Sequence, residues 1–299
     1  MIELSNMFSY NNLNKRTDVD APNSENKQVI VNFSTEHADV TTVLSVQNIS
    51  YAYTGEKSVF SDISFKLHKG EVLCILGANG IGKSTLLNCI CGHNTISQGR
   101  IELDGKNIAS MSVKERALHI AYVPQITHFA CAYSVRDCVV MGRAPYMSTL
   151  AQPKAEQYRI VDEILERMSL RHLAHKTYNA LSGGEQQQAQ IARALAQDTK
   201  ILVLDEPTNH LDFGNQIKIL DMINELRKQG YCILLTTHNP DHALLLDDQV
   251  FVMLEDHKSL HAPARDVITQ SLLQKLYHTQ AYVVFSQEAQ RCACISGAL

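Results

Sequence analysis

The chain has 299 residues, of which 45% are hydrophobic and 19% charged, so it is long enough for one large globular domain or two small ones. Its 27 basic and 31 acidic residues give a formal net charge of −4, without the positive excess that proteins use to neutralise nucleic-acid phosphates. No apolar run approaches the roughly 18 residues of a membrane-spanning helix, and the first residues lack the pattern of a secretory signal. We therefore expect a cytosolic protein that does not bind nucleic acid.

Residues 1–40 differ in composition from the rest of the chain. They are rich in asparagine, contain three basic and six acidic residues, and show no apolar periodicity. Such a segment has too little apolar surface to form a core. The sequence predicts a disordered N-terminal tail that contains most of the net negative charge.

The apolar pattern becomes regular after the tail. Alternating apolar residues predict a half-buried strand at 63–67. The segments VLCIL (72–76), ILVL (201–204) and YCILLT (231–236) are continuous apolar runs, which are typical of strands covered on both faces in a parallel sheet. Helical periodicity lies between them, for example at 213–230. We expect an α/β fold with a mainly parallel, buried sheet.

A glycine-rich segment follows the first of these buried strands and opens a helix. It fits the pattern G-x-x-x-x-G-K-[ST], in which backbone N–H groups and the start of the helix bind phosphate oxygens. Lys83 is expected to reach the β- and γ-phosphates of a nucleotide, and the Ser84 hydroxyl to bind Mg²⁺. The predicted nucleotide-binding residues are Gly77, Ala78, Asn79, Gly80, Ile81, Gly82, Lys83, Ser84 and Thr85.

Two carboxylates end the buried strand at 201–204. Asp205 is predicted to hold Mg²⁺ through water, and Glu206 to polarise the water that attacks the γ-phosphate. A nucleotide site needs a metal-binding carboxylate on a strand near its phosphate loop. The pair therefore completes the chemistry that the glycine-rich segment begins.

The segment Leu181-Ser-Gly-Gly-Glu185 starts a further helix. Taken alone, Ser182 and Glu185 predict only a capping box. The chain order is more informative: a phosphate loop, then LSGG, then a strand ending in Asp-Glu, then Thr-Thr-His at 236–238. From about residue 43 to 260, this order resembles the ATP-binding cassette (ABC) family.

The resemblance implies a P-loop NTPase core with an antiparallel β subdomain and a helical subdomain. It places the ABC ATPase domain at 41–260 and the helical subdomain at about 126–180. Beyond it, at 261–299, we expect a short amphipathic helix (DVITQSLLQKLYH) and then a frayed end (CACISGAL).

Further roles follow from the resemblance where residues match. Tyr53 is placed like the aromatic residue that stacks on adenine, with Tyr51 as the alternative. Gln125 matches the glutamine that contacts Mg²⁺ and the attacking water, and His238 matches the histidine that binds the γ-phosphate. Asp212 belongs to the loop that crosses the dimer interface.

The resemblance also implies a dimer, because two cassettes bind ATP head to tail. The predicted contacts to the ATP of the partner subunit come from Ser182, Gly183, Gly184 and Glu185. Only one set of motifs is present, so the chain needs a second copy or a related cassette. Gln186–Gln188 follow where the family usually has basic residues interleaved with glutamine.

Finer resemblance points to bacterial importers. The segment 134–146, with its MGRAP sequence, and the segments 205–216 and 238–243 resemble importers of ferric siderophores, haem and cobalamin. The implied protein is an ATPase subunit on the cytoplasmic face of the inner membrane, paired with two transmembrane permease subunits and indirectly with a substrate-binding protein. Zinc or manganese import, molybdate import and a soluble ABC ATPase without a permease remain alternatives.

Overall fold

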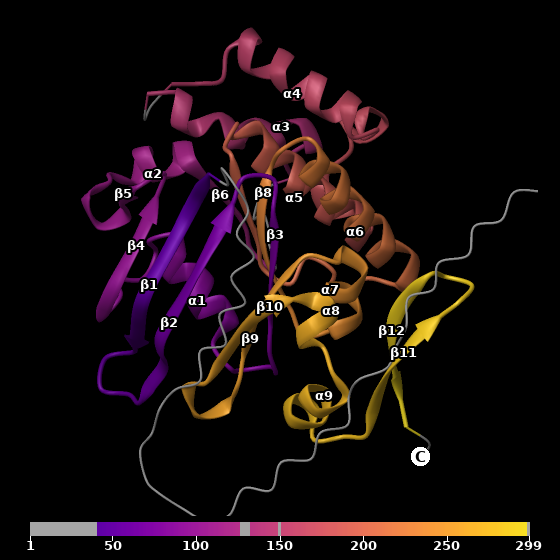
Figure 1. Ribbon diagram of the computed structural model, residues 1–299. Coiled ribbons are helices and arrows are strands. Elements are labelled where there is room, and N and C mark those ends of the chain that lie inside the picture. Colours follow the sequence, from indigo (N-terminus) through magenta and orange to yellow (C-terminus); the bar gives the residue numbers. More distant parts are fainter. Residues whose placement is uncertain (1–40, 126–131, 149–150, 298–299) are drawn as a thin grey trace, which may run out of the picture.

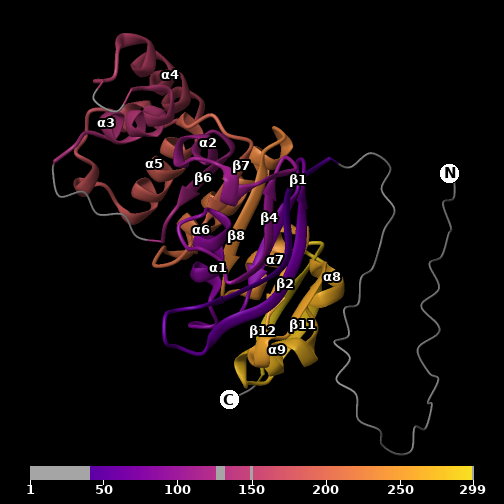
Figure 2. The same ribbon diagram turned by 90° about the vertical axis from the view of Figure 1, so that its left-hand side faces the viewer.

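The computed structural model describes residues 41–125, 132–148 and 151–297. The predicted tail at 1–40 lies outside these ranges, as do residues 126–131. Within them, one six-stranded sheet, one four-stranded sheet and one two-stranded sheet are covered by helices (Figures 1 and 2).

The six-stranded sheet is the centre of the molecule and has the order β10-β9-β3-β8-β7-β6. Five of its strands run parallel, and β10 pairs antiparallel with β9 at one edge. The three continuous apolar runs form β3, β7 and β8, which are buried on both faces because helices cover the sheet on either side. The strands are β3 (Val72–Leu76), β6 (Ile120–Val123), β7 (Ile201–Leu204), β8 (Cys232–Thr237), β9 (Gln249–Met253) and β10 (Ser259–Pro263). The predicted mainly parallel sheet is confirmed.

An antiparallel sheet, with the order β2-β1-β4-β5, faces the central sheet across helix α1 (Figure 1). Leu86, Leu87 and Ile90 of α1 are fully buried in an apolar cluster with residues of both sheets. Helix α1 therefore lies between the two sheets, and the phosphate loop that precedes it is positioned by both. The elements are β1 (Thr42–Ala52), β2 (Ser58–His68), α1 (Lys83–Ile90), β4 (Gln98–Leu103) and β5 (Lys106–Asn107).

The predicted helical region packs at one end of the central sheet, at the top of Figure 1. Its described part contains α3 (Val135–Val140) and α4 (Ala155–Arg167), with short 3-10 helices at Met141–Tyr146, Arg171–Leu173 and Tyr178–Ala180. The 3-10 helix Ile108–Ser110 and helix α2 (Val113–His119) precede this region in the chain, and α5 (Gly183–Ala196) follows it. Helices α6 (Phe213–Lys228), α7 (Pro240–Leu246) and α8 (Ala264–Val267) connect the later strands, and Glu255–His257 forms a 3-10 turn.

The C-terminal region differs from its prediction in one respect. Helix α9 (Gln270–Tyr277) is the expected amphipathic helix, but the expected frayed end is wrong. Strands β11 (Ala281–Ser286) and β12 (Arg291–Ser296) form an antiparallel hairpin instead. Val283, Cys292 and Cys294 pack against the main core, so the tertiary contact supplies the burial that the local sequence does not signal.

The MGRAP segment is bound tightly to α5. A Cβ on Gly142 would lie 2.1 Å from the backbone oxygen of Arg193, so only glycine allows this approach. The buried guanidinium of Arg143 donates to the backbone oxygen of Ala196 at 2.8 Å, near the C-terminal end of α5. The segment therefore attaches the helical region to the helix that LSGG begins.

Replacing Gly142 with alanine is expected to lower the free energy of unfolding by about 1–3 kcal/mol, because the new methyl group overpacks against a backbone oxygen. Denaturant unfolding measures the difference. Gly214→Ala in α6 is the matched control, since its Cβ would meet Asp212 only at an ordinary 3.5 Å. Equal stability of the two variants would contradict the close approach.

Glu71, just before β3, predicts a pH-dependent change in stability. Burial raises its pKa to about 7, while a hydrogen bond from the backbone N of His68 to its Oε2 at 2.7 Å acts in the opposite direction. The folded chain thus holds this proton more tightly than the unfolded chain, and stability falls as the pH rises from about 4.3 to 7.

Glu71→Gln removes that titration. We expect its melting temperature, relative to the unmodified protein, to be higher at pH 8 than at pH 5. Glu115→Gln is the control, because hydrogen bonding from the Ser112 backbone lowers the pKa of Glu115 to about 2. Its carboxyl is therefore largely ionised between pH 5 and pH 8 in both the folded and the unfolded chain. A pH-independent difference for Glu71→Gln would show that its carboxyl is not perturbed.

Candidate functional site

The phosphate loop connects β3 to α1 and places its lysine in the interior. Gly82, directly before α1, has φ +107°, a conformation that favours glycine. Lys83 is 5% exposed, and its Nζ donates to the backbone oxygens of Gly77 at 3.0 Å and Ala78 at 3.1 Å. The ammonium is thereby held within the curve of the loop, and its contact with nucleotide phosphates stays a prediction.

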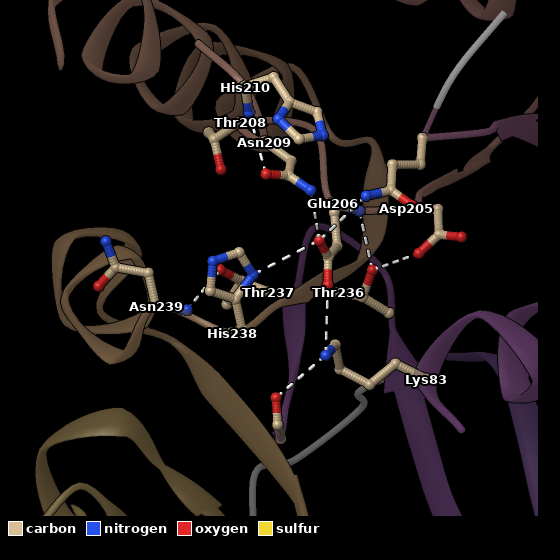
Figure 3. A network of polar contacts seen from close by, with 12 residues as sticks. Lys83, Asp205, Glu206, Thr208, Asn209, His210, Thr236, Thr237, His238 and Asn239 are labelled. Carbon is tan, nitrogen blue, oxygen red and sulfur yellow. Dashed lines mark hydrogen bonds and ion pairs between the residues drawn. The ribbon is translucent and has the colours of Figure 1, made fainter. Parts of the chain in front are cut away.

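Glu206 lies at the centre of a polar cluster (Figure 3). Its Oε1 is 3.2 Å from Lys83 Nζ, and its Oε2 is 3.4 Å from His238 Nδ1. Gln125 Nε2 and Asn209 Nδ2 donate to the same Oε2 at 3.3 and 2.9 Å. The predicted water-polarising carboxylate, the phosphate-loop lysine and the two predicted partners Gln125 and His238 therefore meet at one point.

The backbone turns sharply between the two carboxylates. Glu206 has φ +45°, an uncommon conformation for a residue with a side chain, and its N–H donates to Thr236 Oγ1 at 2.8 Å. The same hydroxyl donates to Asp205 Oδ1 at 2.7 Å, and the Tyr122 hydroxyl donates to Asp205 Oδ2 at 3.3 Å. Burial raises the pKa of Tyr122, which keeps this donor protonated. Thr236 thus links both acidic residues to β8.

The side chains predicted for magnesium suit that ion by their chemistry. Ser84, Gln125 and Asp205 offer hydroxyl, amide and carboxylate oxygens, the donors that Mg²⁺ prefers. Asp205 is only 4% exposed, and neighbouring hydroxyl groups orient both of its oxygens. No cluster of three or more His, Cys, Asp or Glu residues that could hold a metal by themselves occurs in the described part of the chain.

Sequence reasoning missed a second histidine beside His238. The buried side chain of His242, on α7, lies 3.2 Å from Thr208 Oγ1 and 3.3 Å from Thr237 Oγ1 through Nδ1. Its Nε2 lies 3.3 Å from Gln216 Oε1 of α6. Burial lowers the pKa of His242, so the ring is neutral at pH 7 and joins the loops after β7 and β8 through hydrogen bonds. The only sequence cue was the four-residue spacing from His238.

Tyr53 is the better placed of the two tyrosines predicted to stack on adenine. It is 44% exposed, and its hydroxyl lies 3.2 Å from Thr85 Oγ1 in the phosphate loop. Tyr51 is half-buried and stacks on Phe60, with ring centroids 6.1 Å apart. Tyr53 is therefore the more exposed of the two beside the loop, and its ring makes a T-shaped contact with Tyr51, with centroids 5.1 Å apart.

The LSGG segment and the predicted dimer loop lie side by side within the chain. Ser182 and Glu185 form the expected capping box of α5. A Cβ on Gly184 would lie 2.6 Å from Cγ of Asn215, in the first turn of α6, and Asp212 caps that same turn by accepting from the Asn215 N–H at 2.9 Å. A hydrogen bond from that backbone lowers the pKa of Asp212. The two segments predicted to contact a partner subunit thus present one continuous surface.

The described residues include no helix that is both long and apolar enough to cross a membrane.

Comparison with known proteins agrees with this geometry. The sequence profile of the ABC transporter family matches residues 60–209. The molybdate import ATP-binding protein MolC of Haemophilus influenzae is 35% identical over 83% of this chain and 91% of its own length. A probable iron chelatin transport ATP-binding protein of Helicobacter pylori is 36% identical over 82% of this chain and 97% of its own.

Solved structures agree as well. An inward-facing putative metal-chelate type ABC transporter matches 86% of this chain and 98% of its own, with 31% identity and a TM-score of 0.77. Membership of one family accounts both for these similarities and for the phosphate loop, the paired carboxylates and the order of the motifs. The chain belongs to the ABC transporter family and is an ATP-binding subunit with ATPase activity.

Proposed function

We propose that this site hydrolyses ATP with Glu206 as the group that polarises the attacking water. The observation that carries the proposal is the contact of one carboxylate with Lys83, His238 and Gln125 at 3.2–3.4 Å. Backbone N–H groups of residues 77–85 bind the phosphates, and Lys83 neutralises the charge that develops on them. Tyr53 stacks on adenine.

In this proposal His238 and Gln125 position the water and the γ-phosphate around Glu206. His238 Nδ1 lies beside Glu206 Oε2, so the imidazole restricts where that carboxylate can point. When bound, Mg²⁺ supplies positive charge to the phosphate oxygens and is held by Ser84, Gln125 and Asp205. The hydroxyl of Thr236 keeps Asp205 and Glu206 in their separate orientations.

The proposed active unit is a dimer, either of two copies or with a related cassette. Ser182, Gly183, Gly184 and Glu185 contact the ATP bound by the partner subunit, and Asp212 lies in the same interface. Helix α5 begins at this segment, so the positive end of its dipole favours an anion there, although the capping box already engages the Glu185 N–H. The continuous surface of LSGG and the dimer loop supports this arrangement.

Ser182→Arg is expected to bind ATP normally and to lose hydrolysis, because the large side chain blocks the partner's nucleotide. In a Glu206→Gln background, where ATP should hold the dimer closed, Ser182→Arg should leave the chain monomeric. Size-exclusion chromatography with ATP measures this. An ATP-dependent dimer of the double variant would rule out the proposed interface.

We propose that the dimer powers a permease of two transmembrane subunits on the cytoplasmic face of the inner membrane, with a substrate-binding protein acting outside. The helical subdomain, about 126–180, transmits dimer closure to the permease. The MGRAP contacts support such coupling, because they join that subdomain to the helix that LSGG begins.

The proposed cargo is an iron chelate. Support comes from the iron chelatin relative and the metal-chelate transporter structure. The contacts of the MGRAP segment go to α5, so they explain how the helical subdomain is attached and do not indicate which cargo is transported. Molybdate is the second candidate, favoured by the relative MolC, which is similar over most of both chains.

Uptake in cells tests the cargo. Deleting the gene should abolish uptake of ⁵⁵Fe supplied as a hydroxamate siderophore or as haem, and the unmodified gene should restore it while a Glu206→Gln copy does not. Labelled molybdate is measured in the same cells. Loss of molybdate uptake instead would favour the second candidate, and unchanged uptake of both, with the protein on ribosomes, would favour a function without a permease.

A further inference from the structure

The C-terminal region packs against the segment that carries His238. We name α9 and β12, with the connecting residues (270–296), the C-terminal brace. Strand β12 lies beside α7, and α9 lies below α7 in Figure 1. Helix α7 begins at Pro240, two residues after His238. The brace therefore adjoins the loop between β8 and α7, and α9 also packs in one apolar cluster with residues of β3.

One contact from the brace reaches His238 itself. Tyr277, the last residue of α9, donates its hydroxyl proton to the backbone oxygen of His238 at 2.7 Å. Burial raises the pKa of Tyr277, so the hydroxyl remains a donor at any physiological pH. This bond fixes the peptide that follows His238, whose ring lies 3.4 Å from Glu206.

A second set of contacts holds the first turn of α7. Arg291 of β12 makes two bonds to the Asp241 carboxylate, at 3.1 Å to Oδ1 and 3.3 Å to Oδ2. The backbone N–H of Cys294 also donates to Oδ1, at 3.2 Å. Two-point Arg–carboxylate pairs restrict orientation as well as distance. The brace thus fixes the chain on both sides of Asn239.

The same end of α9 also faces the phosphate loop. A cavity of about 190 Å³ separates Ala78 and Ile81 from Lys275 and Leu276 of α9. The same helix thereby borders the loop that binds phosphate and holds the histidine that faces Glu206.

We propose that the C-terminal brace sets the position of His238, and that Tyr277 is a positioning residue for ATP hydrolysis. This rests on the proposed role of His238. Without the Tyr277 hydroxyl, the His238 peptide exchanges its partner for water and the imidazole leaves its place beside Glu206 for part of the time. Loss of this hydroxyl alone leaves α9 in place, and the hydrogen bonds of the brace within the described residues reach neither Lys83 nor the LSGG segment, so ATP binding is expected to stay unchanged.

The test uses the full chain with Tyr277→Phe, which deletes one oxygen. We expect kcat for ATP to fall by about tenfold, as small misplacements of catalytic groups do, while KM stays within about twofold. The melting temperature should change little. Tyr282→Phe, on the exposed face of β11, is the matched control and should leave kcat unchanged.

A second pair of variants tests the salt bridge. Arg291→Gln should lower kcat in the same direction, and Arg291→Lys should restore part of it. Arg265→Gln is the control, because Arg265 pairs with Asp247 at the far end of α7, away from His238. If Arg291→Gln and Arg265→Gln change kcat by the same factor, the brace only stabilises the fold in general, and the proposal is overturned.

His238→Ala distinguishes the proposed role of His238 in hydrolysis from the proposed positioning role of Tyr277. If it leaves kcat unchanged, the proposed role of His238 fails. If it lowers kcat strongly while Tyr277→Phe remains within twofold of the unmodified protein, only the positioning role of Tyr277 fails. A fall in kcat matched by an equal loss of ATP affinity in Tyr277→Phe would also overturn it.

Discussion

Glu206→Gln is expected to reduce the rate of ATP hydrolysis by about 10²–10⁴-fold while ATP still binds. Glutamine keeps the shape of the side chain but cannot accept a proton from water. It also loses the ion pair with Lys83 at 3.2 Å, which leaves the ammonium more available to phosphate. Phosphate release measures the rate, and size-exclusion chromatography with ATP should reveal a trapped dimer.

The exposed pair Glu225 and Lys228 on α6 supplies the control. Glu225→Gln changes the same chemical group outside the site, so it should leave hydrolysis unchanged. Normal turnover by Glu206→Gln would exclude Glu206 as the group that polarises water, and the role would then fall to another residue of the cluster.

Lys83→Ala is expected to weaken ATP binding by at least about 100-fold, since a buried charge next to phosphate contributes several kcal/mol. Lys83 is 5% exposed and held by two backbone oxygens, so its ammonium is prepared for an anion. Fluorescence titration with a labelled ATP analogue measures the affinity.

Two controls accompany this variant. Lys228→Ala removes an exposed lysine and should bind ATP normally. Removing Lys83 also leaves Glu206 without its cation, which destabilises the fold, so the melting temperature must be recorded as well. A folded Lys83→Ala protein with unchanged ATP affinity would contradict the phosphate-binding role.

The sequence predicted the local parts of the site well. The phosphate loop, the strand that ends in Asp205 and Glu206, and the Ser182–Glu185 capping box each depend on neighbours a few residues apart. Such patterns are visible in one dimension because the backbone geometry of turns, caps and buried strands is set locally. The order of these motifs along the chain is itself enough to indicate the family.

The contacts around these parts could not be predicted in the same way. The Glu206 cluster joins residues from four loops, and the left-handed turn at Glu206 has no glycine to signal it. The hairpin of β11 and β12 was missed because its inward residues, such as Cys292 and Cys294, become buried only against the core. His242 and Tyr277 had no motif to mark them.

By itself, the sequence determined which chemical groups the protein has and in what order, including the composition of its acidic tail and a nearly neutral remainder. Only the tertiary structure decided that the Glu206 carboxylate meets Lys83, Gln125 and His238. It also decided that Tyr277 of the C-terminal brace donates a hydrogen bond to the backbone oxygen of His238. The physical reason is distance along the chain. Groups separated by tens to hundreds of residues meet only after the central sheet has paired its strands and buried its helices, and no local pattern encodes that pairing.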